Sequence, residues 1–254
     1  MTTIVSPQNP KLKALRRLQT RRGRTAEGRF LVEGEDLVAA ATAAGRAPLE
    51  GYRLADSEPL VSGGTGEDFQ EVERSALGSV STLGSGTRVI AVYEQLWDGP
   101  AGPLCVYLHG VGDPGNVGTI LRSAAAFGAS CVALGPGCAD PHSPKAVRAS
   151  MGAIFAMSIA RVADPAGLPG ERIALDASAE EPLRGPSPGV EEKPVTLLIG
   201  AEREGLPADV IASSDRLARI PIETESLNAA MAATVALYEM TCRGGRDIDT
   251  VPAS

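Results

Sequence analysis

The sequence predicts an α/β protein built around a mainly parallel sheet with helices on both faces. In residues 104–254, short apolar runs alternate with stretches of helical periodicity, and each run is apolar almost throughout. A strand that is apolar along its whole length is buried on both faces, as in parallel sheets covered by helices. The composition adds that 43% of residues are apolar but only 4% aromatic. Val, Leu, Ile and Ala must therefore fill the core.

The N-terminal part is predicted to be a small α/β domain of residues 1–97 that begins with a basic helix. Leu12, Leu15 and Leu18 fall at helical spacing after a proline, so we expect a helix over residues 10–21. The other elements expected here are a strand at 30–32, an Ala-rich helix at 35–44 and a strand at 88–93.

A break in regular structure separates this part from a second predicted domain. The run Asp98-Gly-Pro-Ala-Gly-Pro103 interrupts helix and strand alike, so residues 98–103 are interpreted as a linker before a domain of residues 104–254. The strands predicted in that domain are 104–108, 130–134, 154–159, 172–175, 195–199 and 217–222. The predicted helices are 116–128, 145–152, 206–213 and 226–241.

The charge is distributed unevenly along the chain. The formal net charge is −7, yet the first thirty residues hold eight basic side chains and only Glu27 as an acid. A basic segment on an acidic body is typical of proteins that bind a polyanion, although a solvated helix face is the alternative. The residues predicted to contact a nucleic acid are Lys11, Lys13, Arg16, Arg17, Arg21, Arg22 and Arg29.

Composition also limits the cellular location and the metal chemistry. No apolar run approaches the ~20 residues that span a membrane, and basic side chains interrupt the N-terminus where a signal peptide would be apolar. We therefore expect a cytoplasmic protein. The four cysteines form no C-x2-C pair and are expected to be buried free thiols, and the two histidines belong to no ligand cluster, so no metal is expected.

The segment from Gly110 to Gly115 matches the G-x-G-x-x-G pattern of dinucleotide-binding loops. Pro114 has no N–H to offer a phosphate, and Asp113 would place an anion where the phosphate should lie. A nicotinamide-dependent oxidoreductase is therefore a minor alternative. We interpret Asp113–Asn116 instead as a tight turn with Asn116 as helix cap, and Arg122 could face the same turn from within that helix.

Two later segments have similar chemistry. A glycine after the buried strand 195–199 lets backbone approach a ligand, and it places Glu202 at the carboxyl edge of the sheet, where α/β proteins bind ligands. Ser226 is predicted to cap the last helix, with Asn228 in its first turn. The alanines over residues 229–233 would allow another helix or a partner subunit to approach closely.

Three strings of this sequence, D-P-G-N-V-G-T-I-L-R, L-I-G-A-E-R-E-G-L and E-S-L-N-A-A-M-A-A, resemble in order the motifs of the SpoU/TrmH family of RNA 2′-O-ribose methyltransferases, in the SPOUT superfamily. The stretch from Ser143 to Phe155 is similar to the middle region of that family, and the N-terminal residues are similar to its ribosomal-protein-like substrate-binding domain. The resemblance covers roughly residues 104–241. A non-catalytic RNA-binding protein is the main alternative.

The resemblance implies a deep C-terminal trefoil knot, in which residues from about Val195 to Tyr238 pass through a loop of the chain. It implies S-adenosylmethionine as cofactor, RNA as substrate (ribosomal RNA more than transfer RNA) and a homodimer through the last helix. It implies cofactor-binding residues, which are Leu175, Leu198, Gly200, Ile220, Ser226 and Leu227. It implies catalytic-site residues, which are Arg122, Asn116, Glu202, Ser226 and Asn228. Arg122 would act either as a base or as an electrostatic clamp, because the free pKa of an arginine exceeds ~12.

Overall fold

The computed structural model describes residues 2–55, 57, 69–83, 86–185, 193–223 and 226–242. The chain divides into two compact units, Met1–Leu96 with Asp140–Ala156, and Trp97–Ala139 with Met157–Ser254. Residues 140–156 thus belong to the first unit although both of their flanks belong to the second. Whether residues 1–97 and 104–254 fold as separate domains stays a prediction.

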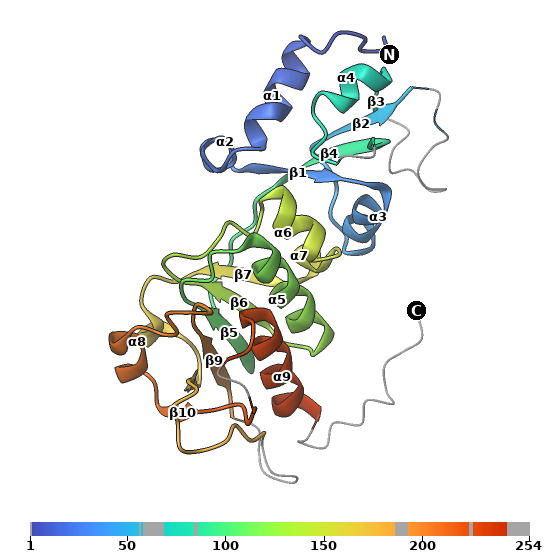
Figure 1. The fold of residues 1–254 in the computed structure, drawn as a ribbon. Coiled ribbons are helices and arrows are strands. Elements are labelled where there is room, and N and C mark those ends of the chain that lie inside the picture. Colours follow the sequence, from blue (N-terminus) through green and yellow to red (C-terminus); the bar gives the residue numbers. More distant parts are fainter. Residues whose placement is uncertain are drawn as a thin grey trace. The chain divides into compact units, whose positions relative to one another are not determined.

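The first unit contains a four-stranded sheet in the order β1-β4-β2-β3 (Figure 1). Strand β4 runs antiparallel to β1 and β2, and β3 runs parallel to β2. Its strands are β1 (Arg29–Glu33), β2 (Glu50–Leu54), β3 (Gln70–Val72) and β4 (Val89–Glu94). Its helices are α1 (Pro10–Leu18), α2 (Arg21–Glu27), α3 (Glu35–Ala43), α4 (Arg74–Gly78), α6 (Pro144–Ala149) and α7 (Ala153–Ala156).

The predicted basic helix over residues 10–21 is in fact two helices. The side chain of Asn9 caps α1 by accepting a hydrogen bond from the Lys11 amide, and three leucines of α1 are buried in the core of the unit. Thr20 then adopts an extended conformation and caps α2 by accepting from the amide of Gly23. Threonine is a good N-cap because its hydroxyl satisfies an amide that the first turn leaves unpaired. The prediction of one continuous helix was wrong at this residue.

The segment 140–156 is held in the first unit by a buried ion pair. Arg24 is 3% exposed and lies 2.7 Å from Asp140, and it also donates to the carbonyls of Leu18 and Gln19 at the turn between α1 and α2. Burial alone would raise the pKa of Asp140, but hydrogen bonds from His142 and the Arg24 guanidinium lower it well below its usual range. Arg24 is therefore part of the structure of the unit.

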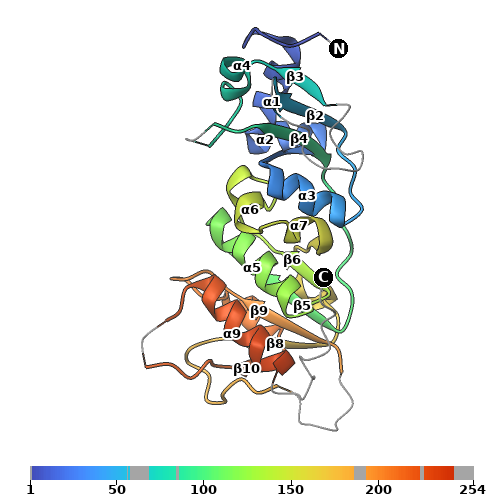
Figure 2. The same ribbon diagram turned by 90° about the vertical axis from the view of Figure 1, so that its right-hand side faces the viewer.

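The second unit contains a six-stranded parallel sheet in the order β10-β8-β9-β5-β6-β7 (Figure 2). Its strands are β5 (Leu104–Leu108), β6 (Cys131–Leu134), β7 (Ser158–Arg161), β8 (Glu171–Leu175), β9 (Val195–Ile199) and β10 (Arg216–Ala218). Its helices are α5 (Pro114–Ala126), α8 (Ala208–Ala212), α9 (Ala229–Cys242) and the 3-10 turn Pro165–Gly167. The predicted α/β class with a mainly parallel sheet is confirmed.

Helices cover both faces of this sheet. On one face, Val210 of α8 packs in a core with Cys105 and Tyr107 of β5. On the other face, α5 and α9 pack against each other, with α5 on β6 and α9 on β9 (Figure 1). This arrangement places the loops that follow β5, β8 and β9 at one edge of the sheet.

Two of the predicted strands were wrong in extent. Residues 153–156 form helix α7, and only 158–161 form a strand. The predicted strand 217–222 is β10 and ends at Ala218. Within the described part of the chain, no helix has the length and apolar character needed to cross a membrane.

Candidate active site

Three side chains from distant parts of the sequence meet at the carboxyl edge of the second sheet. Glu202 accepts hydrogen bonds at Oε1 from Nδ2 of Asn116 and, at 2.8 Å, from Nδ2 of Asn228. The same Nδ2 atom of Asn228 lies 3.2 Å from Oδ1 of Asn116, to which it also donates. We call these three residues the polar triad. The structure therefore brings together one residue from each of the three sequence motifs.

The start of α9 fixes the orientation of Asn228. The helix begins at Ala229, and Oδ1 of Asn228 accepts hydrogen bonds from the amides of Ala230 and Met231 at 2.9 and 3.4 Å. Asn228 is the helix cap, so the prediction that Ser226 is the cap was wrong. Because its oxygen is used by the helix, the amide nitrogen of Asn228 points toward the other two members of the polar triad.

The start of α5 is organised in a similar way. Its cap is Asp113, which accepts from the amide of Asn116 at 3.1 Å, and Pro114 occupies the first helical position, where no amide is needed. The prediction of Asn116 as cap was therefore wrong. Since Asp113 supplies the cap, the side chain of Asn116 is available to reach Glu202.

Glu202 lies on a tight loop that depends on glycine. Ala201 and Gly205 exchange two backbone hydrogen bonds of 3.2 and 2.9 Å, and Gly205 has φ +67°. A Cβ atom on Gly200 would lie 2.2 Å from the backbone of Gly205, so no larger residue fits there. The loop holds Glu202 at the edge of the sheet with its side chain exposed to solvent.

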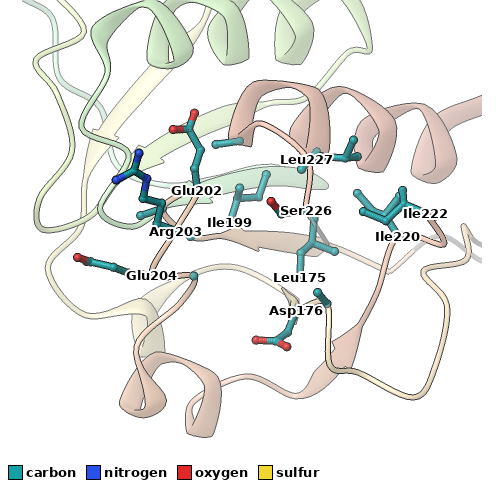
Figure 3. Close-up of a pocket in the computed structure, with 16 residues that line it drawn as sticks. Leu175, Asp176, Ile199, Glu202, Arg203, Glu204, Ile220, Ile222, Ser226 and Leu227 are labelled. Atoms are coloured by element: carbon teal, nitrogen blue, oxygen red, sulfur yellow. The ribbon is translucent and has the colours of Figure 1, made fainter. Parts of the chain in front are cut away.

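Two adjacent cavities open beside the polar triad. The larger cavity, of about 310 Å³, has a wall that includes Leu175, Gly200, Ile220, Ser226 and Leu227 (Figure 3). These are five of the six residues predicted to bind the cofactor. The sixth, Leu198, is buried in the core beneath this edge.

The smaller cavity, of about 280 Å³, is lined by the loop 110–113 and by Asn116. Both cavities share the lining residues 201–204 and Ala229. Glu202 therefore lies at their border. Asp176 and Arg203 also line the larger cavity but were not among the predicted site residues. The signal for Asp176 is its position directly after a buried strand.

Arg122 lies outside both cavities. It is exposed on α5, and neither cavity includes it among its lining residues.

Helix α5 is fixed to α9 by a hydrogen bond between the hydroxyls of Ser123 and Thr234, 2.7 Å apart. A second feature of this region is an exposed apolar stripe on α9, formed by Met231, Val235 and Tyr238 at 62, 42 and 50% exposure.

The alanines near the start of α9 do not belong to that stripe. Ala229, Ala230 and Ala233 are buried within the unit, where α9 packs against α5 and β9. The small side chains were predicted to allow close approach of another helix or of a partner subunit. The structure shows the first of these, because helix α5 packs on them.

The predicted RNA-contacting residues of the first unit differ in their availability. Arg29 forms an ion pair of 3.4 Å with Glu50, and Arg16 is half-buried and donates to the carbonyl of Pro7. The remaining five are exposed, and none has an acidic partner among the described residues. They are Lys11, Lys13, Arg17, Arg21 and Arg22.

Two family models match this chain. Residues 103–238 match the SpoU rRNA methylase family, and residues 9–91 match the MRM3-like substrate-binding domain. A protein of Synechocystis sp. named "Uncharacterized tRNA/rRNA methyltransferase" is 30% identical over 94% of this chain and 93% of its own length.

A relative with a named reaction and a solved structure are similar over the same extent. The 23S rRNA (guanosine(2553)-2′-O)-methyltransferase of Bacillus subtilis is 30% identical over 94% of this chain and 99% of its own. The AdoMet-bound structure of an rRNA methyltransferase from Sinorhizobium meliloti superposes with a TM-score of 0.81 at 30% identity, over 94% of this chain and 96% of that one.

Proposed function

The chain belongs to the SpoU rRNA methylase family, and from that premise we propose that it transfers a methyl group from S-adenosylmethionine to a ribose 2′-hydroxyl of RNA. It is an S-adenosylmethionine-dependent RNA methyltransferase, as its family and its AdoMet-bound structural relative indicate. The position of the acceptor is supported by one observation above all: Glu202, which Asn116 and Asn228 hold, lies at the border of two cavities, one suited to each substrate.

The larger cavity fits the cofactor. Its volume of about 310 Å³ lies within the range of small-molecule sites. Leu175, Ile220 and Leu227 offer apolar surface to an adenine ring, and Gly200 contributes to the same wall. The bound cofactor supplies a methyl group on a sulfonium, which leaves as a neutral thioether.

The smaller cavity fits the ribose that accepts the methyl group. A sugar hydroxyl is a weak nucleophile, so the protein must position it in line and assist loss of its proton. Asn116 and Asn228 both donate to Oε1 of Glu202, which fixes the orientation of the carboxylate. The other oxygen, Oε2, then has a fixed position from which it can accept from the substrate. Glu202 would then orient the hydroxyl, and the two asparagines would hold Glu202.

Arg122 would complete the site from outside the cavities. It would either accept the proton after its surroundings change or bind the RNA phosphate and stabilise the developing alkoxide. Because Arg122 of one chain lines neither cavity, its role requires that RNA or a second copy of the chain bring it to the reacting atoms.

We propose that the second copy does so, in a homodimer through α9. The exposed stripe of Met231, Val235 and Tyr238 has the i, i+4, i+7 spacing of one helix face and lies beside α5, which bears Arg122. If each site uses the partner's arginine, a mixed dimer of one R122A chain and one N116A chain has one intact site. Equal amounts of the two variants, exchanged by dilution, form mixed dimers in about half of all cases, so about a quarter of normal activity should return. No recovery would show that both residues act within one chain.

A matched pair of surface variants tests the dimer itself. M231D should convert the protein to a monomer in sedimentation velocity, because it places a charge in the apolar stripe. V5D is the control, since Val5 is 67% exposed in the first unit. A dimer that persists in M231D, or that is lost in V5D, would contradict the proposed interface.

The trefoil knot is part of the same proposal. Strand β9 is inserted between β8 and β5, and the chain after it returns to place Asn228 beside Asn116. This course is what threading of residues from about Val195 to Tyr238 requires. An experimental structure whose chain can be pulled straight from both ends would contradict it.

The proposed substrate is ribosomal RNA, with the reaction taking place in the cytoplasm. The first unit matches a substrate-binding domain, and a relative similar over nearly its whole length is named for 23S rRNA. The test is incubation with labelled S-adenosylmethionine and total RNA, followed by mapping of the modified nucleotide. Label confined to one ribose of ribosomal RNA is expected; label on a base or only on transfer RNA would refute the proposal.

A non-catalytic RNA-binding role, the alternative that the sequence left open, is outweighed by the family assignment. It is favoured only by the exposed basic residues of the first unit, which do not depend on the polar triad. Calorimetric titration with S-adenosylmethionine separates the two, because an RNA-binding protein without activity has no reason to bind the donor.

A further inference from the structure

Asp176 is a lining residue of the larger cavity to which no role has been given. It follows the last residue of β8, Leu175, at the same sheet edge as the polar triad, and it is half-buried. Its Oδ1 atom accepts from the amide and hydroxyl of Ser178 at 2.8 and 2.5 Å. Within the described residues, no hydrogen bond uses its Oδ2 atom, which is therefore available to a ligand.

The loop that carries Asp176 is fixed by backbone hydrogen bonds. The amide of Asp176 donates to Ala218 of β10 at 3.0 Å, and its carbonyl accepts from Ala179 at 3.2 Å. Arg219 donates to the carbonyls of Ala179, at 2.9 Å, and of Glu180. The carboxylate is thus held in place before any ligand arrives.

The two cavities define which end of the cofactor Asp176 would meet. The methyl group must be delivered at the border of the cavities, where Glu202 lies, so the adenosine must occupy the opposite end of the larger cavity. In Figure 3 the side chains of Leu175 and Ser226 lie between Glu202 and Asp176. Of the described acidic residues that line the larger cavity, Asp176 is the one that does not also line the smaller.

We propose that Asp176 binds the ribose hydroxyls of the cofactor's adenosine. This inference rests on the proposed function and adds a recognition residue to it. A ribose diol presents two O–H donors, and a carboxylate at the end of a parallel strand accepts them in charge-assisted hydrogen bonds. The sulfonium of the cofactor would not be the group that Asp176 binds, because methyl transfer at the border with the smaller cavity requires the sulfonium near Glu202. The carboxylate therefore recognises a part that the cofactor and its product share.

The experiment compares D176N with E180Q in the full chain. Asn at position 176 keeps an oxygen for Ser178 but loses the charge; Glu180 is exposed in the same loop and lines neither cavity, so E180Q removes the same charge outside the site. Calorimetric titration should show that D176N weakens S-adenosylmethionine and S-adenosylhomocysteine equally, by about tenfold, the low end for hydrogen bonds to charged groups. E180Q should bind both as the wild type does.

Deoxy analogues identify the atoms involved. For S-adenosylhomocysteine lacking the 2′- or the 3′-hydroxyl, the difference between wild type and D176N should shrink to less than about threefold for at least one analogue, as in a double-mutant cycle. The inference is overturned by unchanged affinity in D176N, by a loss confined to S-adenosylmethionine, or by full additivity with both analogues. A wild-type protein that binds neither ligand overturns the proposed function instead, before any variant is compared.

Discussion

Asn228 performs two tasks with one amide, and two substitutions should separate them. Its Oδ1 caps α9, and its Nδ2 donates to Asn116 and Glu202. N228S keeps a good capping oxygen but has no second donor that reaches the polar triad. N228A loses both. We therefore expect N228A to destabilise the protein more than N228S does, by about the value of the cap, while both lose activity.

The magnitudes follow from the contacts. Loss of a cap costs about 1 kcal/mol, and Asn228 is exposed, so its two hydrogen bonds add about 0.5 kcal/mol each at most. The expected loss in N228A is about 1–2 kcal/mol, a fall in melting temperature of roughly 2–8 °C. N228S keeps the cap but loses the two Nδ2 hydrogen bonds, so its expected loss is at most about 1 kcal/mol and is smaller than that of N228A by about the value of the cap. Methyl transfer should fall at least about tenfold in both, because a released Glu202 no longer holds its orientation.

Urea unfolding and a single-turnover methyl-transfer assay on the same preparations measure both effects. N116A is the matched control, since it removes a member of the polar triad that caps no helix. It should lose activity with little loss of stability. N228S with wild-type turnover, or N228A as stable as N228S, would refute the division between cap and site.

Three further predictions concern residues outside the cavities. R122A should abolish methyl transfer while S-adenosylmethionine binding in the calorimeter persists; unchanged turnover would remove Arg122 from the mechanism. Neutralising the exposed Arg17, Arg21 and Arg22 together should raise the KM for RNA and flatten its salt dependence; equal affinity at every salt concentration would contradict the basic surface. Because the pKa of Asp140 is lowered in the folded state, its stabilising contribution is present above the unfolded pKa of about 4 and is lost as the pH falls from about 5 to 2. D140N should therefore reduce the dependence of the unfolding free energy on pH over that range, as measured by urea titration. An unchanged slope of unfolding free energy against pH would contradict this prediction.

The sequence predicted the elements of the second sheet better than their ends. Runs such as 104–108 and 195–199 are apolar almost throughout and long enough for one strand, and the structure confirms both. The run at 154–159 has the same composition but is shared between α7 and β7. Apolar character alone cannot distinguish a short buried helix from a strand, which is why this run was predicted as a single strand.

The motif residues were predicted, but the cap assignments were not. Asp113, Asn116, Ser226 and Asn228 all have side chains that can cap a helix. Composition does not tell which of two such residues, two or three positions apart, takes the helix start. In the structure, Asp113 caps α5 and Asn228 caps α9. Similarly, the transfer of residues 140–156 to the first unit depends on a pairing between Arg24 and Asp140, 116 positions apart, which no local pattern shows.

Exposure limits how many of the basic residues can bind RNA. Three of the eight basic residues among the first thirty have partners within the protein. Arg24 forms an ion pair with Asp140, Arg29 forms one with Glu50, and Arg16 donates a hydrogen bond to a backbone carbonyl. Five remain exposed without a described acidic partner. Each phosphate contact to a single strand contributes about −0.7 to the slope of log K against log salt, so this surface accounts for a slope no steeper than about −3.5. A steeper measured slope would mean that cations outside the first thirty residues, such as the half-buried Arg148 that donates to Thr82 on the same unit, also contact the RNA.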